Sequence, residues 1–572
     1  MTRFSRRAVA MDAPRTVARG AKGTYIVDRV IKWSGRGGVT AHPALVVWGI
    51  GVAVILGSTL ALQLWATRKT ALYEALVVVA FSVWLWGVLP RLCALTAPKS
   101  LPTAVALALT GGYIGADFLA ARHAITHAVR IKGDFAIFMQ SLWWTLHGLP
   151  LFNTLEGTSH LGVHASFLLL ALVPLYALWP SPLLLVLVQA VALGLGGLVV
   201  YRIARRYLDP LASLCLLAVF LLYPAYHYDF GDFYESSLAP PLIALTLDSA
   251  LRGRYRAFAV WSLLLLSVKE TFPLMLVLFG VYLLLARRWR PGLGAILLGG
   301  AWLYGAQAVV IPLFRRTYAV FPTVFTPTAF FAQFGGSPAA ILRNVVMEPA
   351  VTAATVLQPG KPAYLLSLVA PYLIVGFAGS LLWIVALPEL AISLLSESSA
   401  RLRIPLLVGS RFAMVIAVSV ALSAVLTLHR LSRAGVDEGR RLQRLVASAM
   451  LFSTLSLVPY WLSSTSLAPV ARPAELRAIM ARVGPAAPVA VPYNIAAPFA
   501  QRAIVLDIDH DPAGVVRSCA RYVALRHDHQ PRQVFAAIVA GGFRRAWSGP
   551  EFEVWRSARA PSCTPRVKPW GA

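Results

Sequence analysis

The sequence is poor in charged residues, and poorest in acidic ones. Only 13% of its 572 residues are Asp, Glu, Lys or Arg, whereas 58% are hydrophobic. Soluble domains carry about 25% charged residues, so this composition excludes an ordinary soluble globule. The long apolar runs that recur along the chain indicate membrane spans instead.

Acidic residues are outnumbered by basic ones, 24 against 52, which gives a net charge of +28. This excess does not indicate nucleic-acid binding, because the chain has no compact basic domain and no basic motif interleaved with aromatic residues. The arginines stand at the ends of apolar runs. Membrane topology and anionic lipid headgroups account for them, so we expect the lipid bilayer as a partner and no nucleic acid.

Cysteine is scarce as well, with 4 residues. No Cys/His spacing is typical of a zinc site, and no Gly-rich phosphate loop follows a strand. Cys93 and Cys215 fall within apolar runs and are expected to pack there as apolar side chains. Cys519 and Cys563 lie in the C-terminal part, where a disulfide is chemically permitted but spacing alone does not establish it.

The sequence does have a regular alternation of loop charge. Short connections at 202–206, 252–256 and 287–290 are rich in arginine, whereas those at 229–235 and 269–270 carry acids. Positively charged loops stay in the cytoplasm, so the acid-bearing loops are predicted to face the extracytoplasmic side. Nearly every candidate catalytic acid is thereby predicted on one face.

These patterns predict an all-α polytopic membrane protein with about 13 spans. The spans are expected near 44–66, 71–96, 103–121, 182–203, 210–226, 236–250, 256–268, 271–286, 292–313, 363–375, 376–395, 408–428 and 445–466. Segment 167–179 is short and is interpreted as a re-entrant or interfacial helix. This choice and a split of the run 363–395 near Gly376 keep the arginine-rich loops inside, with the N-terminus inside and the C-terminus outside.

The chain is therefore expected to have four parts. The first is a basic cytoplasmic tail at 1–43, which does not have the features of a cleaved signal peptide. Two N-terminal spans follow within 44–100, and then a transmembrane core at 101–466 with exported loops 122–181 and 314–362. The last part is an exported domain at 467–572. In the last part, β-rich runs at 489–491 and 503–506 alternate with helix-like stretches such as 532–540, which indicates a small α/β domain.

The first exported loop carries the most specific motif, GDFAIFMQSLWWTLHG at 133–148. As a helix, this segment has a broad apolar side that is suited to lie on the membrane surface. Gln140 and Trp143 are within one helical turn of each other and are candidate substrate-binding residues. Asp134 stands at the start of the segment. Two interpretations are open: an N-cap that accepts backbone hydrogen bonds, or a general base that takes a proton from a hydroxyl acceptor.

Two further loops carry ionisable residues. Lys269 and Glu270 separate two apolar segments, where ionisable groups are costly without a partner or a role. They either pair with each other or with another loop, or Glu270 lies beside a donor phosphate or orients an acceptor. The loop that contains Asp232 and Tyr234 mixes aromatic residues with acids; it is either an interfacial aromatic belt or a site for sugar hydroxyls or a divalent cation.

These motifs, with Pro-Leu-Tyr at 174–176, the span that contains Gln189 and Val-Pro-Tyr-Asn-Ile-Ala-Ala-Pro-Phe at 491–499, resemble an uncharacterised prokaryotic membrane family, domain of unknown function 2079. The resemblance covers about residues 100–560. That family is in turn similar to the C-type integral-membrane glycosyltransferases, which include protein mannosyltransferases and the lipid A aminoarabinose transferase.

The resemblance implies a glycosyltransferase of this type in the cytoplasmic membrane of a prokaryote, with a polyprenyl-phosphate sugar donor and a glycan, lipid or protein acceptor. It makes Asp134 the residue that activates the acceptor. His164 matches a histidine of the family, and it is expected to bind donor or acceptor or to cap a helix. Tyr234 stands where the family favours histidine, which weakens the case for metal ligands there, and a divalent cation remains unassigned.

The donor phosphate needs positive charge. Exported candidates are Lys269, Arg315, Arg316, Arg401, Arg403 and Arg411, and each has an alternative role as an interfacial cation. If the protein is an enzyme, Asp134, His164 and Glu270 are expected to meet around one cavity. A transporter or flippase of a lipid-linked or polar solute, and a non-catalytic membrane scaffold, are the alternative functions.

Overall fold

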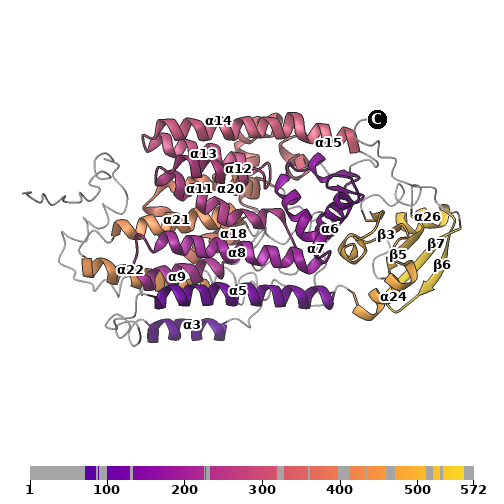
Figure 1. Cartoon of the computed structure of the whole chain (residues 1–572), viewed down its shortest axis with the longest axis horizontal. Helices are drawn as coiled ribbons and strands as arrows, with labels where there is room; N and C mark the ends of the chain where they lie inside the picture. The colour runs from indigo at the N-terminus through magenta and orange to yellow at the C-terminus, as the bar shows by residue number, and fades with distance from the viewer. Residues whose placement is uncertain are drawn as a thin grey trace, which may run out of the picture. The chain divides into compact units, whose positions relative to one another are not determined.

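The computed structural model describes residues 71–84, 88, 100–128, 133–223, 226, 232–318, 327–358, 361–396, 413–431, 436–458, 471–509, 520–527 and 532–558. The chain divides into two units, Met1–Ala41 and His42–Ala572, and every described residue belongs to the second. Within it, helices dominate and a sheet forms near the C-terminal end (Figure 1). The predicted basic tail, the span at 44–66, Arg401, Arg403 and Arg411, and Cys93, Cys519 and Cys563 lie outside the described residues.

Three described helices are long and apolar enough to cross a membrane. They are α5 (Leu101–Thr126), α8 (Pro182–Ala204) and the continuous helix Trp289–Arg316, in which α14 (Trp289–Gly305) passes through a π-helical turn (Ala306–Val310) into α15 (Ile311–Tyr318). The most apolar window of α8 is 61% buried, against 17% for the other two. Helix α8 is therefore central, whereas the other two leave most of their apolar surface for lipid.

Shorter helices occupy most of the other predicted spans. They are α3 (Ala71–Val83), α9 (Pro210–Leu221), α11 (Ala239–Leu251), α12 (Tyr255–Leu266), α13 (Phe272–Leu285), α21 (Met414–Leu431) and α22 (Val436–Ser456). Residues that favour helix starts lie at their boundaries. Helices α8 and α9 begin at Pro182 and Pro210, and the side chains of Ser181 and Asp209 cap them. The mostly helical fold is as predicted, whereas the number of membrane spans stays a prediction.

The apolar run 363–395 is broken, and in more than one place. It forms α18 (Lys361–Val369), a 3₁₀ turn (Ala370–Tyr372), α19 (Val375–Ala378), a second 3₁₀ segment (Leu381–Ala386) and α20 (Leu387–Leu395). Leu373 has a positive φ of 52°, and the Ser380 hydroxyl caps the segment after Gly379. The Arg430 guanidinium at the end of α21 donates to the Gly379 carbonyl. This break therefore lies at the same end of the helices as Arg430, and the split of the run into two membrane spans stays a prediction.

Two acids lie at the arginine-rich ends of the helices. Asp248 of α11 pairs with Arg206 at 2.6 Å, and Asp209 at the start of α9 pairs with Arg444 of α22 at 2.7 Å. Both pairs join helices that are distant in sequence. These carboxylates fix helix ends to each other and are not candidates for the site described below.

The first predicted exported loop is compact. It contains α6 (Gly133–Leu146), the hairpin of β1 (Phe152–Asn153) and β2 (Thr158–Ser159), a 3₁₀ turn (His160–Gly162), a 3₁₀ segment (Phe167–Leu172) and α7 (Val173–Leu178). The expectation that α6 lies on the membrane surface is wrong. Phe135, Phe138 and Leu142 are buried in a protein core that includes Val489 and Phe499 of the C-terminal domain.

The second predicted exported loop is largely helical. After α15 it forms a 3₁₀ segment (Pro327–Phe334), α16 (Pro338–Met347) and α17 (Pro349–Val356). Lys361 follows these helices, and its ammonium group donates to the carbonyls of Thr355, Leu394 and Ser396 at 2.6–2.9 Å. One buried cation thus binds the C-terminal carbonyls of α17 and α20, where helix dipoles favour positive charge.

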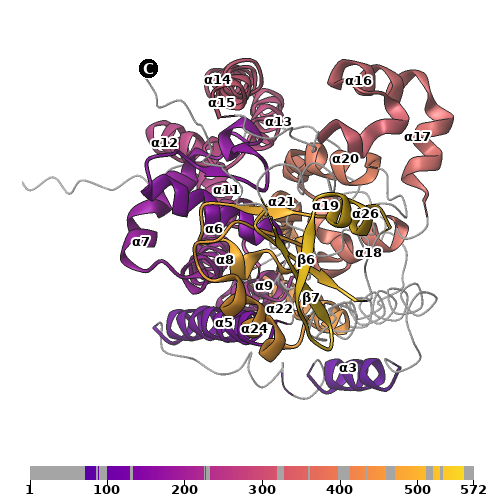
Figure 2. The same cartoon turned by 90° about the vertical axis from the view of Figure 1, so that its right-hand side faces the viewer.

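The C-terminal part is an α/β domain with a five-stranded sheet in the order β4-β3-β5-β7-β6. Its elements are α24 (Pro473–Val483), β3 (Val489–Val491), the 3₁₀ turns η12 (Tyr493–Ile495) and η13 (Ala497–Phe499), β4 (Val505–Asp507), β5 (Tyr522–Arg526), α26 (Arg532–Ala540), β6 (Phe543–Ser548) and β7 (Phe552–Ser557). Strand β3 is parallel to β4 and β5, whereas β7 is antiparallel to β5 and β6. Figure 2 views this sheet from the side away from the helices.

The predicted secondary structure of this domain agrees well with the structure. The run 489–491 is β3, the helix-like stretch is α26, and the predicted strand at 503–506 begins two residues later, at Val505. One core cluster of the domain continues into α6 and α7, whereas a second, which includes Ile504, Val523 and Ile538, belongs to the domain alone. The domain is therefore packed against the first predicted exported loop.

Candidate functional site

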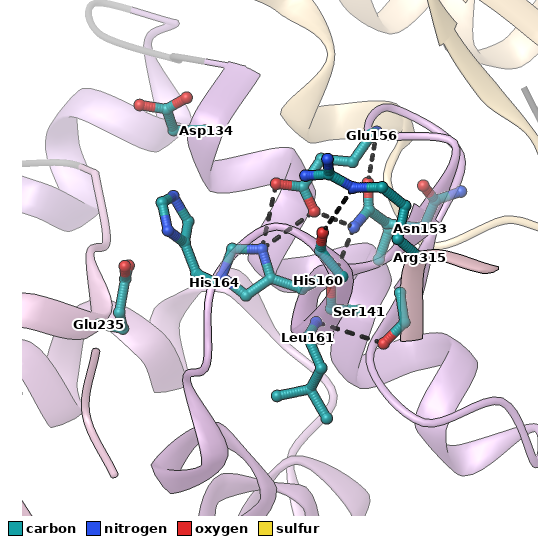
Figure 3. A network of polar contacts seen from close by, with 12 residues as sticks. Asp134, Ser141, Asn153, Glu156, His160, Leu161, His164, Glu235 and Arg315 are labelled. Atoms are coloured by element: carbon teal, nitrogen blue, oxygen red, sulfur yellow. Dashed lines mark hydrogen bonds and ion pairs between the residues drawn. The ribbon is translucent and has the colours of Figure 1, made fainter. Parts of the chain in front are cut away.

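Asp134 lies in the first turn of α6, because the helix begins one residue earlier at Gly133. Its carboxylate is partly exposed and accepts a hydrogen bond from the hydroxyl of Tyr493 in η12. Figure 3 shows Asp134 in the same close-up as the loop that carries His160 and His164. A partly exposed carboxylate that is held by a side-chain donor can act as a positioned base, and this role of Asp134 stays a prediction.

Glu270 lies between α12 and α13, and both of its oxygens bind the first predicted exported loop. One accepts from Nδ1 of His164 at 2.7 Å, and the other accepts from the backbone N–H of Ala165 at 3.0 Å. Burial raises the pKa of Glu270, but the attraction and hydrogen bond of His164, together with Lys269, outweigh burial and bring it down to about 2. The structure therefore joins two of the predicted site residues, Glu270 and His164, as a carboxylate–imidazole pair.

Lys269 pairs with Glu235, not with its neighbour Glu270. The ammonium group lies 2.7 Å from the Glu235 carboxylate, and both side chains are buried. Burial raises the pKa of Glu235, but Lys269 and then His160 and His164 outweigh it and bring the value down to about 2. Both residues thus pair with other loops and not with each other, and a role of Glu270 beside a donor phosphate or an acceptor stays a prediction.

A second carboxylate–imidazole pair, Glu156 and His160, was not predicted from the sequence. Glu156 lies in the turn of the β1–β2 hairpin, 2.9 Å from Nδ1 of His160, and it also accepts from Asn153 at 2.7 Å. Burial lowers the pKa of His160, but Glu156 and then Glu235 outweigh burial, so the pKa is raised overall. Burial raises the pKa of Glu156, but His160 and Asn153 hold it below its usual value. The regular spacing of Glu156, His160 and His164, four residues apart each time, was the available signal.

The two imidazole rings stand edge to face, with their centroids 5.4 Å apart. The Nε2 atom of His160 is buried and has no hydrogen-bond partner among the described residues. Three carboxylates, one ammonium group and two imidazoles thus gather from three loops: Glu156, Glu235, Glu270, Lys269, His160 and His164. We call this set the charged cluster. Glu156, His160, Glu235 and Glu270 have perturbed pKa values, and the gathering of such groups is typical of functional sites.

Arg315 of α15 contacts the same loop. Its Nε donates to the carbonyl of Gly162 at 3.0 Å, as Figure 3 shows. A Cβ at position 162 would lie 2.8 Å from the backbone nitrogen of Arg315, so only glycine admits α15 at this distance. The first residues of the predicted exported loop 314–362 therefore pack against the charged cluster.

Gln140 and Trp143, predicted to bind substrate, lie on the other side of α6. Gln140 is fully buried; its amide donates to the Arg502 carbonyl at 3.0 Å and its oxygen accepts from Thr154 N at 2.8 Å. The Trp143 ring stacks on His147 with centroids 3.8 Å apart. Gln140 thus contacts the C-terminal domain, and substrate binding by either residue stays a prediction.

Asp232 and Tyr234 contact each other. The Tyr234 hydroxyl donates to the Asp232 carboxylate at 3.0 Å, and both side chains are buried. Gln189 of α8 bridges the two backbones, because its amide donates to the Asp232 carbonyl and its oxygen accepts from Tyr234 N. In the part of the chain that the structure describes, no group of three or more His, Cys, Asp or Glu residues is arranged to hold a metal ion.

A small cavity lies beside the charged cluster, lined by Ser236, Lys269, Thr271, Phe272, Glu389, Met414 and Val415. Glu389 belongs to α20 and is 6% exposed. Its carboxylate therefore faces a mostly apolar space next to a buried ammonium group.

The apolar helices, the loops with buried ions and the packed C-terminal domain define a helical membrane protein with an α/β domain. The family described as "Predicted membrane protein (DUF2079)" matches residues 133–513, and the chain belongs to this family. No curated protein matches the sequence. Among solved structures, the crystal structure of ArnT from Cupriavidus metallidurans bound to undecaprenyl phosphate is similar over 80% of this chain and 98% of that chain, with 12% identity and a TM-score of 0.40. This likeness is too weak to transfer a fold or a residue's role.

Proposed function

We propose that this protein is an integral-membrane glycosyltransferase that moves a sugar from a polyprenyl-phosphate donor to an acceptor on the extracytoplasmic face of a prokaryotic cytoplasmic membrane. The observation that carries the proposal is the combination of a partly exposed, positioned carboxylate at Asp134 with the buried charged cluster, whose Glu156, His160 and His164 belong to the same predicted exported loop as Asp134. The resemblance to the C-type glycosyltransferases supports the choice of donor.

In the proposed reaction, Asp134 accepts the proton of the acceptor hydroxyl. The acceptor oxygen forms a bond to the anomeric carbon of the sugar, and the bond from that carbon to the phosphate oxygen breaks. Polyprenyl phosphate leaves with the bonding electrons. Asp134 suits the role of base because it is partly exposed at the start of α6, where an incoming hydroxyl group has access.

The leaving phosphate needs positive charge or hydrogen-bond donors. Lys269 is paired with Glu235, so it supplies little net charge by itself. Arg315 is a better candidate, because among the described residues only its Nε is bonded, to Gly162, and the side chain is half-buried beside the His160 turn. The imidazole of His160 is the other candidate donor, since its Nε2 has no partner among the described residues.

The position of the ionisable groups favours an enzyme over a transporter. The charged cluster is built from loops at the ends of apolar helices, whereas transporters place such groups on broken helices near the middle of the membrane. The proposed reaction also needs an acceptor that arrives from water and a donor anchored in lipid. In this proposal, the site lies at the helix ends, beside a domain outside the helices, where both substrates would meet.

The proposal is tested by mass spectrometry of cell-envelope glycans and glycolipids from cells that lack the gene and cells complemented with variants. Wild-type protein is expected to restore a glycan or glycolipid that the deletion removes, and Asp134→Asn is expected not to. Glu551→Gln is the matched control, because Glu551 is an acid of the C-terminal domain that pairs with exposed Arg472. Restoration by Asp134→Asn at equal protein level would refute the proposal.

One observation favours transport as a second candidate. Glu389 is buried within the apolar run 376–395 and lines the cavity beside Lys269, and intramembrane acids are typical of proton or ion pathways. If transport is the function, Glu389→Gln abolishes uptake or export by proteoliposomes, whereas Asp134→Asn leaves it intact. The opposite pattern is expected for the glycosyltransferase.

A further inference from the structure

We propose that the C-terminal domain completes the candidate site by supplying Tyr493 as a positioning residue for Asp134. In this role, the Tyr493 hydroxyl holds the Asp134 carboxylate in its charged form and in one orientation. The role of this contact in catalysis rests on the proposed function. The contact itself and its effect on the carboxylate can be tested without any sugar transfer.

The C-terminal domain fixes the backbone of Tyr493. Tyr493 follows β3 by two residues, and its N–H donates to the carboxylate of Asp509 at 2.9 Å. Asp509 is itself anchored, because its N–H donates to Asp507 at the end of β4 at 2.8 Å. Since β3 and β4 are parallel neighbours, the edge of the sheet holds the turn that presents the tyrosine. The hydroxyl is therefore aimed by the sheet and not by a loose chain end.

On the other side of the contact, the start of α6 leaves space for the Tyr493 ring over Gly133, and we call this space the seat of the ring. A Cβ at Gly133 would lie 2.3 Å from two carbon atoms of the Tyr493 ring, closer than any side chain can approach. Position 133 must therefore be glycine for the ring to pack over the start of α6. Gly133, directly before Asp134, thus leaves the space in which Tyr493 reaches Asp134.

A polar interface at the far side of α6 holds the two parts in register. The Thr154 hydroxyl contacts both the carbonyl and the N–H of Val505, the latter at 3.0 Å. Gln140 and Trp144 donate to the carbonyls of Arg502 and Ala503 at 3.0 and 3.1 Å. Gln140 and Thr154 are buried, so leaving these groups unpaired would cost stability. The interface therefore resists displacement of Tyr493 from Asp134.

The chemistry of the contact follows from the donor. A phenol O–H that donates to a carboxylate favours the charged form, which is the form that can accept a proton. It also restricts the rotation of the carboxylate, and a base must be oriented to act on a bound hydroxyl. Tyr493 keeps its own proton throughout, so it acts through Asp134 and takes no part in bond formation.

The test uses the full-length protein in lipid nanodiscs and a water-soluble carbodiimide with glycine ethyl ester as the probe. This reagent labels a protonated carboxyl group, and peptide mass spectrometry measures the labelling of Asp134 at each pH. For Tyr493→Phe, the midpoint of the labelling curve is expected to move up by about 1 pH unit, because a hydrogen bond to the charged form is lost. A curve that overlays the wild-type curve would overturn the inference.

Two more variants separate this effect from general damage. Tyr176→Phe removes another hydroxyl of the same interface, which accepts from Gln501 at 2.8 Å, and it is expected to leave the Asp134 curve unchanged. Gly133→Ala keeps the Tyr493 hydroxyl but fills its seat, so it is expected to shift the curve as Tyr493→Phe does. If Gly133→Ala labels like wild type, the proposed seat is wrong even when Tyr493→Phe shifts the curve.

These outcomes are distinct from failure of the proposed function. If Asp134→Asn restores the cell-envelope glycans, glycosyl transfer by Asp134 is refuted while the labelling results still decide whether Tyr493 controls the carboxylate. If the labelling curves do not move but Asp134→Asn abolishes the glycan, the base stands and the positioning role of Tyr493 falls.

Discussion

Lys269 and Glu270 are neighbours in the sequence, yet their side chains bind two different loops. Lys269 pairs with Glu235 at 2.7 Å, and Glu270 pairs with His164 at 2.7 Å. One dipeptide between α12 and α13 thus ties together η5 (Glu235–Leu238) and the loop after the 3₁₀ turn at His160. The consequence is a charged cluster in which each charged side chain of the dipeptide has its own partner.

Removing the charge of Glu270 should therefore be costly. Glu270→Gln leaves His164 and the Ala165 N–H without their carboxylate in a buried place. We expect a loss of about 3 kcal/mol in the free energy of unfolding, which denaturant titration in detergent micelles would measure. Glu551→Gln, which breaks a pair with the exposed Arg472, is expected to cost less than about 1 kcal/mol. Equal losses in the two variants would contradict the buried pair.

Stability should depend on pH at both ends of the range. The pKa of Glu235 and Glu270 is lowered to about 2, so their contribution is fully present above their unfolded pKa of 4.5 and is lost as pH falls towards 2. The pKa of His160 is raised above 6.5, so its contribution is present below pH 6.5 and is lost as pH rises through the folded value. The melting temperature is therefore expected to be highest between about pH 4.5 and 6.5.

The alkaline part of this profile has its own check. His160→Gln removes the titrating group, so the melting temperature of this variant is expected to change less between pH 6.5 and 9 than that of wild type. Glu156→Gln should have the same effect, because Glu156 is the largest of the causes that raise the His160 pKa. If the melting temperature of both variants still falls between pH 6.5 and 9 as steeply as that of wild type, groups other than His160 cause the fall.

The interface between the first predicted exported loop and the C-terminal domain can be weakened at one atom. Thr154→Val keeps the shape of the side chain but removes the hydroxyl that contacts Val505 N and O. We expect a loss of about 1 to 3 kcal/mol and faster proteolytic release of the C-terminal domain. Thr126→Val is the control, since among the described residues that exposed hydroxyl bonds only within and next to its own helix. Identical protease resistance of Thr154→Val and wild type would refute the interface.

The predicted topology is testable by reporter fusions. Arg440 lies in α22, whose Arg444 pairs with Asp209 at the arginine-rich helix ends, so a fusion there is expected to read cytoplasmic. Gly541 lies between α26 and β6 of the C-terminal domain, so a fusion there is expected to read extracytoplasmic. A cytoplasmic signal at Gly541 would reverse the placement of the domain, and with it the side of the membrane proposed for the reaction.

Local patterns in the sequence determined most of the secondary structure. Apolar runs between Pro, Ser and Asp starts became helices such as α8 and α9, and β3 and α26 lie where β-rich and helical patterns predicted them. Loop charge separated the arginine-rich helix ends from the loops that carry Asp134 and Glu270. These features depend on neighbours within a few turns, so a single sequence suffices to predict them.

Tertiary structure alone decided which ionisable groups meet. Tyr493 and Asp134 are 359 positions apart, and no local pattern indicates their contact. The prediction for α6 was wrong because an amphipathic helix has the same sequence pattern whether its apolar face meets lipid or another domain. Glu156 and His160 passed unnoticed because a carboxylate and an imidazole become a buried pair only when the chain around them excludes water. The sequence thus determined the helices and the charge of their loops, whereas packing decided the partners within the site, because desolvation and hydrogen bonding act between segments that the sequence leaves far apart.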